Sequence, residues 1–138
     1  MSATTRRRGV LAVVRDRDGA VLMQLRDDRP DIVWPAHWSV LGGGTEPGES
    51  AREAVVREVH EESGLVVRDA REIGQVVDEH GSGQLLHVFV VDFRGDPGQL
   101  VLGEGQRLEF VARHRWPDLL IPPYVRELLR ALPEQGDT

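Results

Sequence analysis

A glycine-rich turn followed by a helix that carries three glutamates constrains this chain most. Residues 43–65 read GGTEPGESAREAVVREVHEESGL. Helical spacing places Glu58, Glu61 and Glu62 on one side of a short helix, since they are separated by three and four residues. Like charges so close together weaken a helix unless something positive lies among them. Hard divalent cations bind carboxylate oxygens, so the segment predicts a metal site directly after the glycines.

Local signals set both ends of this helix. Ser50 and Glu53, three residues apart, form the pattern of a capping box at the N-terminus. Gly64 is a natural C-terminal stop. The expected buried face consists of Ala51, Ala54, Val55 and Val59.

The rest of the chain alternates between strand-like and turn-like segments. An Asp-Gly pair at 18–19 separates two apolar runs, which is typical of a β-hairpin. Strands are expected at 9–15, 20–25, 38–41, 65–67, 73–79, 84–93 and 107–111. The strand 38–41 enters a turn made by Gly42, Gly43 and Gly44, and Pro122-Pro123 opens a second helix at 124–132.

Composition limits the class of protein. The chain of 138 residues fits one mixed α/β domain, 1–138, with 1–8 and 133–138 as flexible ends. It has no cysteine, which excludes disulfides, thiol catalysis and cysteine zinc sites. A net charge of −6 disfavours a nucleic-acid partner, and no apolar run approaches a membrane span. The N-terminus is no secretory signal, so we expect a cytoplasmic monomer or homodimer without membrane or nucleic-acid partners.

Residues 43–65 match the Nudix box, G-x5-E-x7-R-E-U-x-E-E-x-G-U, in which U is a bulky aliphatic residue. The fixed positions are Gly43, Glu49, Arg57, Glu58, Val59, Glu61, Glu62, Gly64 and Leu65. The chain therefore resembles a Nudix hydrolase of the MutT-like subgroup. This resemblance implies the Nudix α/β/α sandwich, with a mixed β-sheet between helices.

The resemblance also implies a role for each charged residue of the box. Glu58 and Glu62 are the core ligands of Mg²⁺, for which Mn²⁺ could substitute, and Glu61 is a further ligand or a proton acceptor. Glu49 and Arg57 form a bidentate pair that locks the loop against the helix and orients Glu58.

Two further candidate ligands lie outside the helix. In the family, a main-chain carbonyl at the position of Gly42 often completes the metal shell. Glu104, within residues 103–106, resembles the additional glutamate ligand of MutT-type members. Glu109 is its competitor, but alternation with apolar neighbours favours a solvated strand face for Glu109.

The resemblance, together with these residues, implies a magnesium-dependent pyrophosphohydrolase whose small-molecule substrate is a nucleoside diphosphate linked to another group. Water attacks one phosphorus, and Glu61 or Glu104 takes the proton; the sequence leaves both open. The first substrate expected is a nucleoside triphosphate, cleaved to monophosphate and pyrophosphate, and the second is an ADP-ribose-like nucleotide sugar. A non-catalytic nucleotide-binding module is disfavoured because no carboxylate of the box is lost.

Recognition of the base is the least constrained part of the function. In MutT-type enzymes that act on oxidised guanine nucleotides, an amide just after paired prolines reads the base, whereas this chain has Tyr124 and Val125 there. We therefore expect modest selectivity among bases. Trp34 is the candidate for stacking and Trp38 is expected in the core. The histidines, which show no ligand spacing, are expected to be structural or exposed: His37, His60, His80, His87 and His114.

Overall fold

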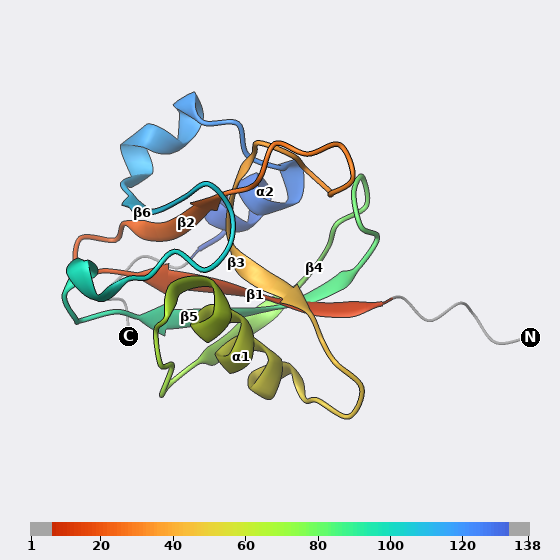
Figure 1. Cartoon of the computed structure of the whole chain (residues 1–138), viewed down its shortest axis with the longest axis horizontal. Coiled ribbons are helices and arrows are strands. Elements are labelled where there is room, and N and C mark those ends of the chain that lie inside the picture. The colour runs from red at the N-terminus through yellow and green to blue at the C-terminus, as the bar shows by residue number, and fades with distance from the viewer. Residues whose placement is uncertain (1–6, 133–138) are drawn as a thin grey trace, which may run out of the picture.

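A computed structural model of the chain describes residues 7–132 as one mixed sheet with a helix on each face (Figure 1). The six strands are β1 (Arg8–Arg15), β2 (Val21–Leu25), β3 (Trp38–Gly44), β4 (Arg71–Val77), β5 (Leu85–Asp92) and β6 (Arg107–Val111). The helices are α1 (Ala51–Ser63), α2 (Pro123–Arg130) and the short 3-10 helices η1 (Pro97–Gln99) and η2 (Arg113–Asp118). In space the strands run β4-β5-β1-β3-β2-β6, and within residues 7–132 only the β1–β5 pair is parallel.

Strand β1 shows why the sheet is covered on both faces. Its alternate residues Val10, Ala12 and Val14 belong to a core cluster with α1, whereas Leu11 and Val13 belong to a second cluster with α2. Side chains of a strand alternate between faces, so a strand that is apolar throughout must lie between two layers. The expected α/β/α sandwich is confirmed.

Most predicted element boundaries are confirmed within two residues. The hairpin between β1 and β2 closes through the Asp16 amide, which donates to the Ala20 carbonyl at 3.0 Å, and Gly19 has a φ of 83°. The strand predicted at 65–67 is wrong, and the strand predicted at 73–79 begins earlier, at Arg71. The apolar residues of this segment serve packing rather than strand pairing, since Leu65 and Val67 pack into the core beside α1.

The three glycines after Leu41 do not form the predicted turn. They continue β3, and Gly42, Gly43 and Gly44 pair with residues of β1. A side chain at Gly42 would collide with the Val10 carbonyl oxygen of that neighbouring strand. Here glycine is needed for close approach between chain segments rather than for a reversal of the chain.

The predicted ends of the domain fall mainly outside the described residues. Residues 1–6 and 133–138 lie beyond them, while Arg8 is already the first residue of β1. Within residues 7–132, no helix combines the length and apolar character that crossing a membrane requires.

Candidate active site

Helix α1 is held rigidly at both ends, which fixes the glutamates it carries. The Ser50 hydroxyl accepts from the Glu53 amide at 3.1 Å, and the Glu53 carboxylate accepts from the Ser50 amide at 2.9 Å. At the other end Gly64 has a φ of 78°, and its amide donates to the His60 carbonyl at 2.8 Å. The predicted capping box and glycine stop are both confirmed, so α1 has defined ends.

Arg57 ties α1 to the loop that precedes it. Its Nε and Nη2 donate to the two carboxylate oxygens of Glu49 at 2.8 and 2.9 Å, and Nη2 also donates to the Gly44 carbonyl at 3.0 Å. This is the bidentate pair expected from the sequence. The guanidinium beside Glu49 lowers the pKa of that carboxyl to about 2.

The same guanidinium orients Glu58. Its Nη1 donates to Glu58 Oε1 at 2.9 Å, and a Cβ built on Gly43 would lie only 2.5 Å from that oxygen. The Glu58 carboxylate therefore lies directly against the main chain of β3. Burial raises the pKa of Glu58, although the charge of Arg57 opposes that effect.

Glu62 is the most deeply buried carboxylate of the cluster, with 3% of its surface exposed. It accepts from the Gly42 amide at 2.9 Å and from Gln24 Nε2 at 3.3 Å. Burial is the main cause that raises the pKa of Glu62 to about 8, and the charges of Glu58 and Glu104 add to it. Among residues 7–132, these two neutral groups are the only hydrogen-bond donors to the Glu62 carboxylate, so a bound cation would compensate its charge.

Glu61 and Glu104 surround this pair less closely. The Glu61 side chain is 47% exposed, and its oxygens lie 3.4 Å from Arg57 Nη1. The charge of Glu104 raises the pKa of both Glu58 and Glu62, which places it within electrostatic reach of them. Both remain candidates for the proton acceptor.

The main chain holds the Glu104 segment against the end of α1. The Val101 amide donates to the Ser63 carbonyl at 2.9 Å, and the Gly103 amide donates to the Glu62 carbonyl at 3.1 Å. Gln24, buried in β2, donates its side-chain amide to the Glu104 carbonyl at 3.0 Å as well as to Glu62. No local sequence signal marks Gln24, because a glutamine in a strand ordinarily faces solvent.

Glu109 lies apart from this cluster. It forms ion pairs with Arg107 at 3.0 Å and with Arg115 at 2.9 Å. Its charge is therefore already compensated on the surface of β6. This favours Glu104 over Glu109 as the fourth carboxylate.

The carboxylates fit a hard cation by their chemistry but are not gathered into a tight cage. Among residues 7–132, no three acidic or histidine side chains converge closely enough to enclose an ion. The buried and undercompensated Glu62 and the neighbouring Glu58 nevertheless offer oxygen donors alone, which suits Mg²⁺. Those carboxylates would hold the ion, with water and substrate oxygens as the remaining ligands.

Trp34, the candidate for base stacking, and Tyr124, which follows the paired prolines, have polar neighbours that the sequence did not predict. The Trp34 indole Nε1 donates to the Asp78 carboxylate at 3.1 and 3.2 Å, and the Tyr124 hydroxyl is hydrogen-bonded to Ser39. Burial raises the pKa of Tyr124 to about 12. Polar groups of β3 and of the chain after β4 therefore lie next to Tyr124. Trp38 packs partly buried against the core, as expected.

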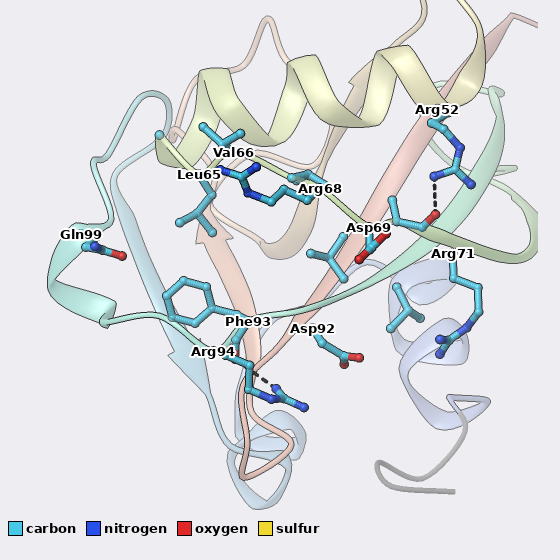
Figure 2. Close-up of a pocket in the computed structure, with 15 residues that line it drawn as sticks. Arg52, Leu65, Val66, Arg68, Asp69, Arg71, Asp92, Phe93, Arg94 and Gln99 are labelled. Atoms are coloured by element: carbon cyan, nitrogen blue, oxygen red, sulfur yellow. Dashed lines mark hydrogen bonds between the residues drawn. The ribbon is translucent and has the colours of Figure 1, made fainter. Parts of the chain in front are cut away.

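A large pocket of about 980 Å³ contains none of the candidate carboxylates (Figure 2). It lies below α1, between the chain that follows the helix and the end of β5. Figure 2 shows the side chains of Arg52, Arg68 and Arg94 spread around it rather than pointing to a common centre. Size alone therefore does not identify the site, and the smaller pockets beside the carboxylates are the relevant ones.

Comparison with known proteins finds the same family along nearly the whole chain. A profile described as NUDIX domain matches residues 5–132. The CTP pyrophosphohydrolase of Escherichia coli K12 is 36% identical over 92 residues, 62% of this chain and 64% of that protein. The nucleoside triphosphatase NudI of E. coli K12 is 43% identical over 60 residues, 43% of this chain and 41% of that protein. Each match thus spans less than two thirds of the relative.

Solved structures with the same fold cover almost all of the chain. The MutT protein of Methanosarcina mazei Go1 superposes with a TM-score of 0.72 at 24% identity, over 94% of both chains. The NUDIX domain of Shewanella oneidensis NrtR, solved with ADP ribose, gives a TM-score of 0.75 at 15% identity, over 93% of this chain and 86% of that one. At these identities the likeness concerns the fold.

Proposed function

The chain belongs to the Nudix family, and we propose that it is a magnesium-dependent pyrophosphohydrolase that cleaves nucleoside triphosphates to monophosphates and pyrophosphate. The observation that carries this proposal is Glu62, a buried carboxylate beside Glu58 with too little positive charge around it. The names of the two E. coli relatives, a CTP pyrophosphohydrolase and a nucleoside triphosphatase, support the substrate class.

The reaction adds water across one phosphoanhydride bond. The water oxygen forms a bond to phosphorus, the bridging P–O bond breaks, and the products are a nucleoside monophosphate and pyrophosphate. When bound, Mg²⁺ neutralises phosphate charge, stabilises the leaving oxygen and lowers the pKa of water. Glu61 or Glu104 accepts the proton that water loses, since both lie at the edge of the cluster.

Arg57 has a positioning role in this proposal. Its bonds to Glu49 and to Gly44 hold the loop, and its third bond directs Glu58 toward the glycines. A site held in advance needs little rearrangement when substrate arrives.

Arg26 is a candidate for contact with the substrate phosphates. It lines the pocket that contains Glu104 and also the pocket that contains Gly42 and Gly43. Its Nε donates to the Val33 carbonyl at 2.8 Å, so this bond uses only one of the three guanidinium nitrogens. Guanidinium groups match phosphate oxygens in charge and geometry.

A panel of substrates with identified products tests the proposal. The panel contains the ribo- and deoxyribonucleoside triphosphates and ADP-ribose, each with Mg²⁺ and with EDTA. We expect release of pyrophosphate from triphosphates, loss of activity in EDTA and recovery on addition of Mg²⁺. Cleavage of ADP-ribose alone would replace the proposed substrate by the alternative. Absence of any Mg²⁺-dependent hydrolysis would favour a binding module instead.

A further inference from the structure

A small pocket beside the glycines of β3 carries a second, unassigned group of polar side chains. We call it the Trp34 pocket; its volume is about 170 Å³. Its lining includes Arg26, Trp34, Ser39, Gly43, Asp78 and Tyr124. Gly43 also touches the Glu58 carboxylate, so the pocket adjoins the candidate active site directly.

Asp78 is the unusual member of this pocket. Only 2% of its surface is exposed, and no ion pair to it is recorded within residues 7–132. The Trp34 indole donates to both of its oxygens, and the Ser82 amide donates to Oδ2 at 2.9 Å. These donors fix its position but are neutral. A buried carboxylate without a cationic partner is costly for stability, which indicates a use beyond packing.

The loop that presents Trp34 is strained. Trp34 and Ala36 have φ values of 54° and 58°, in the left-handed region that side chains other than glycine rarely adopt. Such strain concentrates at binding sites, where the surrounding structure holds it. Here the Arg26 bond to Val33 and the edge-to-face contact of His37 with Trp34, at 5.2 Å, hold the loop.

The chemistry of a carboxylate limits what it can recognise. An ionised carboxylate only accepts hydrogen bonds. Cytosine and adenine offer an exocyclic amino group as a donor, whereas thymine, and uracil likewise, has a carbonyl oxygen at the corresponding position. We propose that Asp78 accepts from the amino group of the substrate base, so that the Trp34 pocket selects nucleotides with amino-bearing bases. This inference rests on the proposed function, because it assumes that the triphosphate lies along Gly43.

Direct binding of non-hydrolysable nucleotides tests the inference independently of turnover. The α,β-methylene analogues of CTP and UTP form one matched pair, and those of ATP and ITP form another. Affinities are measured by calorimetry with Mg²⁺. Of the two pairs, the one with the higher affinity for the wild-type protein is the informative one. In that pair we expect the nucleotide with the amino group to bind about 10- to 100-fold more tightly, which is the discrimination that one good hydrogen-bonded contact to a base provides. Equal affinity within both pairs would overturn the inference.

Substitutions then assign the preference to Asp78. Asp78→Asn adds an N–H donor, so the preference should fall below about threefold. Glu79→Gln, which removes an exposed carboxylate one residue away, is the matched control and should keep the preference. An unchanged preference in Asp78→Asn would overturn the role of Asp78. Equal weakening of both members of a pair would also overturn it, since that is the behaviour of a merely structural residue.

A second variant covers the case in which Asp78→Asn does not fold. A methyl group at position 81 would collide with Asp78 Oδ2 and with the Trp34 indole nitrogen, so Gly81→Ala displaces the carboxylate without removing it. We expect Gly81→Ala to lose the preference, and retention would count against Asp78. If binding shows the preference but no triphosphate is hydrolysed, the proposed activity fails while the base pocket stands. If triphosphates are hydrolysed but no base preference is found, the inference about Asp78 fails while the proposed activity stands.

Discussion

Replacing Glu62 by glutamine should stabilise the metal-free protein while it abolishes activity. The pKa of Glu62 is raised from 4.5 to about 8 in the folded protein. The folded state therefore keeps its proton at pH values where the unfolded chain has released it. The stability associated with this group is fully present below pH 4.5 and is lost progressively as the pH rises toward 8.

The size of the effect follows from the shift. Between pH 4.5 and pH 7, about 2.5 units, deprotonation of Glu62 stabilises the unfolded chain relative to the folded protein by about 1.4 kcal/mol per pH unit. At pH 7 the free energy of unfolding is therefore about 3 kcal/mol lower than it is below pH 4.5. Glutamine is neutral at every pH and keeps the acceptor for the Gly42 amide. It loses the bond from Gln24, at a cost of about 1 kcal/mol. The net gain at pH 7 is about 2 kcal/mol, or roughly 8 °C in Tm for a domain of this size.

Urea and thermal unfolding in EDTA at pH 5 and pH 7 measure this difference. When the pH is raised from 5 to 7, the free energy of unfolding of wild type should fall by about 2 to 3 kcal/mol more than that of Glu62→Gln. Glu79→Gln, at an exposed position, should behave like wild type. In the presence of Mg²⁺, wild type should gain stability relative to Glu62→Gln, because the ion binds only the folded protein that retains the carboxylate.

Turnover supplies the second half of this prediction. The kcat of Glu62→Gln should fall by at least about 10²-fold, as when a metal's electrostatic role is lost. An identical pH dependence of stability in wild type and variant would refute the argument from burial. A folded Glu62→Gln protein with wild-type turnover would refute the assignment of Glu62 as a metal ligand.

Three further predictions concern the surroundings of Glu62. Glu104→Gln should reduce kcat far more than Glu109→Gln, because Glu109 is already paired with arginines; a larger effect at Glu109 would reverse the assignment. Gly43→Ala should lower kcat at least about tenfold with the circular dichroism spectrum unchanged, because the methyl group displaces the Glu58 carboxylate; wild-type kinetics would mean that this close contact is unimportant. The kcat/KM for 8-oxo-dGTP should exceed that for dGTP by less than about 10²-fold, since no carboxamide follows the paired prolines; a ratio of 10⁴ would require a base-reading group not identified above.

The sequence predicted those features that depend on local chemistry. The capping box at Ser50, the stop at Gly64 and the pairing of Glu49 with Arg57 all involve short separations along the chain. Their residue types and spacing are therefore sufficient. The mixed α/β class was also predictable, because helical and strand periodicities are visible without knowing the pairing. The layered sandwich was expected only from the resemblance to Nudix hydrolases.

Features that depend on tertiary pairing were missed. The role of Gly42 in β3 follows from the close approach of Val10, thirty-two positions earlier in the sequence. Gln24 and Asp78 are buried because distant segments cover them, and nothing in their immediate neighbours indicates it. The strand wrongly predicted at 65–67 illustrates the same limit, since a short apolar run fits the core equally well with or without strand pairing.

Two main-chain hydrogen bonds to the end of α1 hold the Glu104 segment in place. Its position therefore does not depend on the conformation of the chain between β5 and Val101. Because Val101 and Gly103 are anchored on carbonyls of the helix, the connection between β5 and Val101 can lengthen or shorten without moving Glu104. Gly103 itself cannot change, since a methyl group there would overlap the Glu61 carbonyl oxygen. The exposed connection through η1 is thus a place where peptide tags or binding loops could be inserted while the geometry of the carboxylates is preserved.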